Sequence, residues 1–114
     1  MELNLKKPII FFDLETTGTN ITTDRIVEIS MIKIMPNGEE KERTLRINPE
    51  MPIPEEATAV HHITNDDVAN CRTFKEIAKD LAQSFVGCDI AGFNSNKFDI
   101  PMLDQEFQRV GVKF

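Results

Sequence analysis

The 114-residue sequence lacks any apolar run long enough to cross a bilayer, because a membrane-spanning helix needs about 20 apolar residues. Its first residues, MELNLKKPIIFF, contain no small-residue cleavage site of the kind that ends a secretory signal peptide. Only two cysteines are present, Cys71 and Cys88, and they lack the spacing of metal ligands. We therefore expect a cytoplasmic protein with reduced thiols, and the sequence leaves a disulfide between the two open.

The sequence also lacks an excess of positive charge, since its formal net charge is −6 at pH 7. Lys97 and Arg109 are too isolated to form a basic patch. This argues against non-specific nucleic-acid binding through a basic surface. It does not exclude a nucleic-acid enzyme that holds phosphates through metals, because two divalent ions would bring the net charge to about −2.

No internal repeat, low-complexity tract or change of composition marks a second domain. The 40% hydrophobic and 28% charged residues are ordinary for a globular protein of this length. We therefore expect residues 1–114 to belong to a single domain.

Three stretches in the first half of the chain predict β-strands. IIFF at 9–12 indicates a buried strand, and RIVEISMIKIM at 25–35 indicates a long central strand. PNG at 36–38 predicts a tight turn, so the charged stretch 39–48 should return as an antiparallel strand at the sheet edge. The three prolines of 49–57 predict irregular structure.

Helix signals follow in the second half. Thr64 and Asp67 indicate a short helical turn, and Thr73 with Glu76 forms a capping box. Gly87 should end the helix that the capping box begins. The apolar residues of that helix recur at helical spacing: Phe74, Ile77, Ala78, Leu81 and Phe85.

The last third predicts a short buried strand at 88–94 and a helix over 98–111. Pro101 has no N–H, so it should lie in the first turn of that helix, which places Asp99 at or within the same turn. The element order predicts an α/β sandwich with an antiparallel half and a parallel half.

Asp13 and Glu15 follow the first apolar run directly. Strand side chains alternate between faces, so both acids should point to the same side, and like charges there raise each other's pKa. A divalent metal between them would remove the conflict; the alternative is a pair of solvated acids at a strand end. TTGTN at 16–20 predicts a turn in which Gly18 is free to take a positive φ.

These motifs resemble those of the DEDD superfamily of 3′–5′ exonucleases. FFDLETTG at 11–18 resembles the first motif, and GFNSNKFDIPML at 92–103 resembles the second. PEEATAVHHIT at 54–64 is similar to the stretch that contributes a Glu and a His to substrate binding in the proofreading subunits of bacterial DNA polymerase III. The resemblance implies a ribonuclease H-like fold, α/β, with three antiparallel strands and a fourth parallel strand in one mixed sheet.

The resemblance also implies roles for individual residues. Asp13, Glu15 and Asp99 match the catalytic carboxylates that hold two Mg²⁺ or Mn²⁺ ions. Asp99 could instead only cap a helix, His61 could be a packed histidine, and Glu56 could be solvated. The substrate-binding residues that the resemblance implies are Leu14, Thr16, Thr17, Gly18, Glu56, His61 and Asn94.

Histidine-type members of this superfamily carry a third motif, a His with an Asp five residues later. Here that spacing occurs at His61 and Asp66, between the first two motifs, so we reject the match. We interpret the chain as an exonuclease domain truncated at its C-terminus, with three of the four acidic ligands. The edge of the 88–94 strand and the inner faces of both helices should then lack cover, and we expect self-association.

The leading hypothesis is a metal-dependent 3′–5′ exonuclease domain of the proofreading type, acting on single-stranded DNA 3′ ends beside a polymerase subunit. As this chain alone it should be inactive or weak, and the choice of DNA or RNA stays open. One alternative is a non-catalytic module that binds metal or nucleic acid. Another is a different ribonuclease H-like nuclease, such as a resolvase, which the string DLETTG disfavours.

Overall fold

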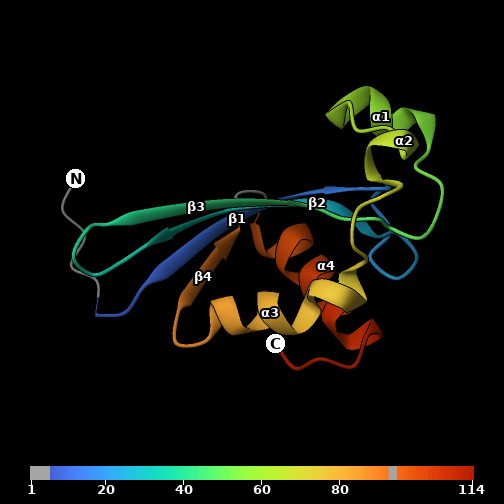
Figure 1. Ribbon diagram of the computed structural model, residues 1–114. Coiled ribbons are helices and arrows are strands. Elements are labelled where there is room, and N and C mark those ends of the chain that lie inside the picture. The colour runs from blue at the N-terminus through green and yellow to red at the C-terminus, as the bar shows by residue number, and fades with distance from the viewer. Residues whose placement is uncertain (1–5, 93–94) are drawn as a thin grey trace.

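The computed structural model describes residues 6–92 and 95–114, which form a four-stranded mixed sheet and its helices (Figure 1). The strand order is β3-β2-β1-β4; β1 pairs antiparallel with β2 and parallel with β4, and β2 pairs antiparallel with β3. This confirms the predicted fold class. In chain order the elements are β1 (Ile9–Thr16), β2 (Ile26–Ile34), β3 (Glu40–Arg46), α1 (Glu55–His61), α2 (Asn65–Val68), α3 (Phe74–Phe85), β4 (Asp89–Gly92) and α4 (Ser95–Arg109).

The side chains of β1 alternate between the two faces of the sheet. Ile10, Phe12 and Leu14 are buried, whereas the residues between them are half-buried on the opposite face. That opposite face carries Asp13 and Glu15, as the alternation predicts. The two acids are therefore at the end of a strand whose other face is anchored in the core.

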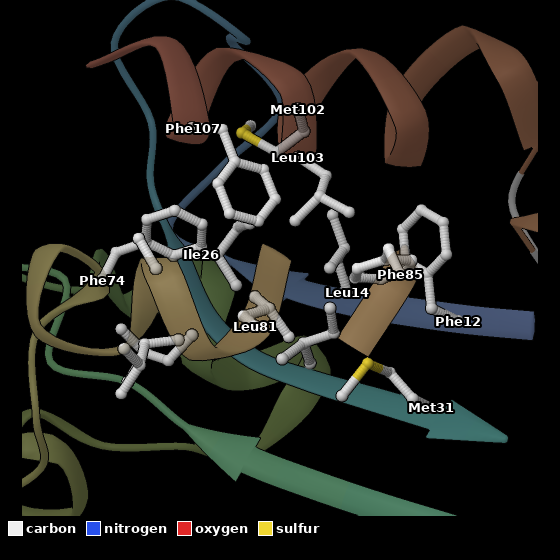
Figure 2. Close-up of a cluster of buried hydrophobic side chains, with 14 of the residues drawn as sticks. Phe12, Leu14, Ile26, Met31, Phe74, Leu81, Phe85, Met102, Leu103 and Phe107 are labelled. Carbon is white, nitrogen blue, oxygen red and sulfur yellow. The ribbon is translucent and has the colours of Figure 1, made fainter. Parts of the chain in front are cut away.

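The main core lies between the sheet and the helices α3 and α4, which cover the same side of the sheet (Figure 1). Figure 2 shows aromatic and aliphatic side chains from both helices meeting those of β1 and β2. The ring centroids of Phe12 and Phe85 are 6.2 Å apart, and those of Phe74 and Phe107 are 5.0 Å apart, both edge to face. Burial of each such side chain stabilises the fold by about 1.5–3 kcal/mol.

α3 forms as the sequence predicts. Thr73 accepts a hydrogen bond from the backbone N–H of Glu76, and the Glu76 side chain accepts one from the N–H of Thr73. These bonds lower the pKa of Glu76. All five apolar residues of the predicted stripe are buried, and Gly87 follows the helix end with a φ of 74°.

α4 begins earlier than predicted. The helix starts at Ser95, so Pro101 is its seventh residue and lies inside the helix rather than in its first turn. Asp99 correspondingly lies beyond the acid-free first turn. The expectation that Asp99 lies at or within the first turn is therefore wrong.

α1 is a helix that the sequence analysis missed. Residues 49–57 are irregular only up to Pro54, the N-cap, and two glutamates follow in the first turn. Acids in the first turn of a helix are favourable, so a signal was present. α1 and α2 lie at one end of the sheet (Figure 1), where a second apolar cluster joins Val27, Ile53, Ile63 and Val68.

The predicted lack of cover is found only in part. β4 is at an edge of the sheet, with β1 as its neighbour. The inner faces of α3 and α4 are covered, however, since Phe74, Leu81, Leu103 and Phe107 are each 0% or 1% exposed. That half of the expectation is wrong, because the sheet itself buries these faces.

Two further observations concern the cysteines and membrane-spanning helices. Cys71 and Cys88 are both free and partly accessible. No helix within residues 6–92 and 95–114 is long and apolar enough to span a bilayer.

Candidate active site

The end of β1 positions the first pair of acids. Asp13 is paired with Ser30 of β2, and Glu15 with Glu28. The register shifts after Glu15, so Thr16 is paired with Ile26 and one residue of β2 is left over as a bulge. Such a bulge bends the strand that contains it, here β2, and increases the local twist opposite Glu15.

Electrostatics connect Glu15 with acids from other elements. Burial raises the pKa of Glu15, and the charge of Asp13 raises it further. His61 lowers it, whereas the charges of Glu28 and Asp99 raise it. Side chains from β1, β2 and α4 therefore place several negative charges within reach of one carboxyl group.

Asp99 lies on α4, close enough for its charge to affect Glu15, and is only 1% exposed. Carboxylate oxygens are the ligands that Mg²⁺ and Mn²⁺ prefer, so the donor types of Asp13, Glu15 and Asp99 fit these ions. Within the described residues no group of three or more His, Cys, Asp or Glu side chains is assembled to hold a metal ion. Bringing the three carboxylates together as metal ligands thus stays a prediction.

The buried residue Thr17 stabilises the turn after β1 through hydrogen bonds inside the turn. Its hydroxyl donates to Asp24 Oδ1 at 2.8 Å and accepts from the N–H of Arg25 at 3.0 Å. The N–H of Thr17 donates in turn to the carbonyl of Arg25 at 2.9 Å. Thr17 therefore serves first to shape the turn.

Gly18 is required for a reason that differs from the predicted one. Its φ is not in the positive range, where Gly38, Gly87 and Gly111 are found. A Cβ at Gly18 would instead lie 2.8 Å from Asp24 Cγ, closer than real contacts allow. The other oxygen of Asp24 accepts the N–H of Asn20 at 2.9 Å, so the carboxylate cannot easily move away.

His61 is bound to the main chain through both ring nitrogens. The N–H of Ile63 donates to Nδ1 at 3.1 Å, so Nδ1 is the acceptor in this bond. Nε2 then carries the proton and donates to the carbonyl of Thr16 at 3.0 Å. His61 thus supports the turn after β1. Because both ring nitrogens already bond to the main chain, any contact with substrate must use the face or the carbon edge of the ring.

A cleft of about 510 Å³ lies between this turn and α1. Seven of its lining residues were predicted from the sequence, whereas Asp24 and Val60 were not. Val60 is 76% exposed, and no periodic pattern marked it because α1 was not predicted. Asp13 and Asp99 do not line the cleft, and Asn94 lies outside the described residues. The predicted site residues along the cleft are Leu14, Glu15, Thr16, Thr17, Gly18, Glu56 and His61.

The chain is similar in sequence to a family of known proteins. The profile of the RNase_T family, described as exonuclease, matches residues 10–113. The chain is 34% identical over 95 residues to DNA polymerase III subunit epsilon of Treponema pallidum (strain Nichols), covering 83% of this chain and 44% of that protein. It is 32% identical over 117 residues to the subunit of the same name from Buchnera aphidicola subsp. Schizaphis graminum, covering 97% and 50%.

The fold is also that of a solved nuclease. E. coli Exonuclease I in complex with a dT13 oligonucleotide superposes with a TM-score of 0.83 at 19% identity, covering 95% of this chain and 25% of that chain. At this identity the match shows the fold alone. The chain spans about half the length, or less, of the two relatives above.

Proposed function

The chain belongs to the RNase_T family of DEDD 3′–5′ exonucleases, and from that membership we propose that residues 1–114 form part of a metal-dependent domain that hydrolyses phosphodiester bonds at DNA 3′ ends. The observation that carries the proposal is electrostatic. The charges of Asp13 and Asp99 both raise the pKa of Glu15, and Glu15 lines the cleft. Negative charges gathered at a cleft are what a phosphodiesterase needs in order to hold divalent cations.

Asp13, Glu15 and Asp99 would hold the metal ions in this proposal. When bound, a pair of such ions activates water and offsets the charge on the attacking and leaving oxygens. Glu15 must be ionised to bind a metal ion. Because burial and the neighbouring acids raise its pKa, metal binding should depend on pH. The charge of the cations would reverse that effect and keep the carboxylate ionised.

The cleft would take the 3′-terminal nucleotide. Val60, an exposed apolar side chain on α1, offers a surface for the base, and Glu56 lies one helical turn before it. Leu14, Thr17 and Gly18 form the opposite wall. Following the resemblance, we propose substrate contacts for these residues and for Thr16, His61 and Asn94.

DNA is the proposed substrate class for two reasons. Two relatives are named as subunits of DNA polymerase III, and the solved structure with the same fold is a complex with dT13. We extend the proposal to a polymerase partner on the strength of the relatives' names. RNA stays as the alternative polymer that the test must separate.

A second candidate function is a non-catalytic module that binds metal or nucleic acid. Two observations favour it for the 114-residue chain alone. The sequence after Asp99 contains no His followed five residues later by an Asp, and the described residues contain no assembled group of three metal-ligating side chains. For this reason we expect cleavage by the chain alone to be weak or absent.

The test uses single-stranded DNA with a 5′ label and an RNA of the same sequence, each with Mn²⁺. Stepwise shortening of the DNA that Asp13→Asn abolishes and Asp66→Asn leaves intact supports the exonuclease. Asp66 is a matched control, because it is an exposed acid on α2 and forms the rejected His-Asp spacing. Mn²⁺ binding without shortening supports the non-catalytic module, and a chain that neither binds Mn²⁺ nor cleaves overturns both.

A further inference from the structure

Glu106 is a buried carboxylate that the proposed chemistry does not use. It is 2% exposed and lies on α4. A buried charge is costly unless hydrogen bonds and an opposite charge compensate it. Both are present: Arg109 Nε donates to one oxygen of Glu106 at 2.8 Å, and the backbone N–H of Ile26 donates to the other at 3.2 Å.

Ile26, the residue of β2 that binds Glu106, lies beside the β-bulge. Ile26 is the residue paired with Thr16 directly after the bulge that follows Glu15. A bulge disrupts the ladder of backbone hydrogen bonds, and the N–H of Ile26 here meets a side chain from a segment 80 residues away. Glu106 therefore joins α4 to the sheet next to the point where β1 presents Glu15.

The same helix carries Asp99, seven residues before Glu106. Seven residues make about two helical turns, so the two acids share one face of α4. Met102 and Leu103, between them, are both 0% exposed, and Figure 2 shows them on the side of α4 that faces the sheet. Pro101 lacks an N–H and so removes one helical hydrogen bond in this stretch, which increases the need for side-chain anchoring.

We propose that Glu106 is a positioning residue that sets the rotation of α4 and thereby holds Asp99 toward Glu15. The apolar contacts of α4 are non-directional, whereas the bond from Ile26 to Glu106 specifies one rotation of the helix. This inference rests on the proposed function, since its consequence is the geometry of the metal-binding carboxylates.

Three variants of the full chain test it. Glu106→Leu removes the acceptor, Glu106→Gln keeps an oxygen for Ile26, and Leu81→Ala loosens the core from α3 without touching Glu106. Leu81 is 0% exposed, so its truncation reports the effect of lost stability alone. The readouts are amide hydrogen exchange at Ile26, Mn²⁺ affinity by electron paramagnetic resonance, and the urea midpoint.

We expect Glu106→Leu to speed exchange at Ile26 about tenfold or more and to weaken Mn²⁺ binding by about tenfold, as loss of supporting residues does at metal sites. Glu106→Gln should restore both. Leu81→Ala should lower the urea midpoint while the folded protein binds Mn²⁺ as the wild type does.

Unchanged Mn²⁺ affinity in folded Glu106→Leu, or equal weakening by Leu81→Ala, overturns the positioning role while the proposed function stands. A wild-type chain that binds no Mn²⁺ overturns the proposed function and with it this inference. Exchange at Ile26 separates the two failures, because it reports the hydrogen bond whether or not metal binds.

Discussion

At the scale of single residues, the surroundings of Glu15 disfavour the ionised form of its carboxyl group. Burial and the charges of Asp13, Glu28 and Asp99 all raise its pKa. A raised pKa means that the folded protein binds the proton more tightly than the unfolded chain does. The stabilising contribution of Glu15 is therefore present below its unfolded pKa and is lost as the pH rises through its folded pKa.

We predict that Glu15→Gln stabilises the metal-free protein at pH 7 relative to the wild type, by less than about 1 kcal/mol because Glu15 is partly solvated. The difference should vanish near pH 4, where the wild-type carboxyl is largely protonated (about 4.3 when unperturbed). Urea unfolding at the two pH values measures it.

Adding Mn²⁺ should reverse this order, because a ligand that binds only the folded state stabilises it and Glu15→Gln would bind the ion more weakly. Glu40→Gln, an exposed acid on β3, is the charge-matched control and should show neither effect. A Glu15→Gln protein that is less stable than the wild type at pH 7 without metal would contradict the prediction.

At the scale of elements, the turn between β1 and β2 is a constrained unit rather than a loose loop. Asp24 joins Thr17 and Asn20, and its carboxylate fills the space that a side chain at position 18 would need. His61 holds the same turn from α1 through the carbonyl of Thr16. The cleft wall therefore depends on contacts from two directions.

Gly18→Ala should destabilise the protein by about 1–3 kcal/mol, because overpacking forces the Asp24 carboxylate out of its hydrogen bonds. In an Asp24→Ala background the same substitution should cost much less, since the clash is gone. A double-mutant cycle by urea unfolding measures the coupling. Strict additivity of the two changes would show that the close approach has no energetic weight.

At the scale of the whole molecule, an apolar hollow of about 470 Å³ lies beside the edge strand β4. Val86, which is 68% exposed, and Phe114, which is 41% exposed, line it together with Ile90. An open strand edge next to exposed apolar side chains favours association with a second copy of the chain.

Sedimentation should therefore show an association that increases with protein concentration and that Val86→Lys weakens. Val60→Lys is the matched control, because Val60 is similarly exposed at the other end of the sheet. A compact monomer at high concentration, or equal association of both variants, would contradict the prediction.

The local patterns of this sequence were sufficient to predict most of the fold. Alternation in β1 predicted which face carries Asp13 and Glu15, and the Thr73 capping box predicted the start of α3. These signals could be recognised because hydrogen bonding and burial within one strand or helix repeat with a fixed period along the chain.

The tertiary structure alone decided how the site is supported. No spacing indicates that Asp24 excludes a side chain at Gly18, that His61 Nε2 donates to the carbonyl of Thr16, or that Glu106 accepts from the N–H of Ile26. Each contact joins segments with no periodic relation in the sequence. Such contacts exist only once packing has set the distances between elements, and a linear pattern of residue types contains no record of those distances.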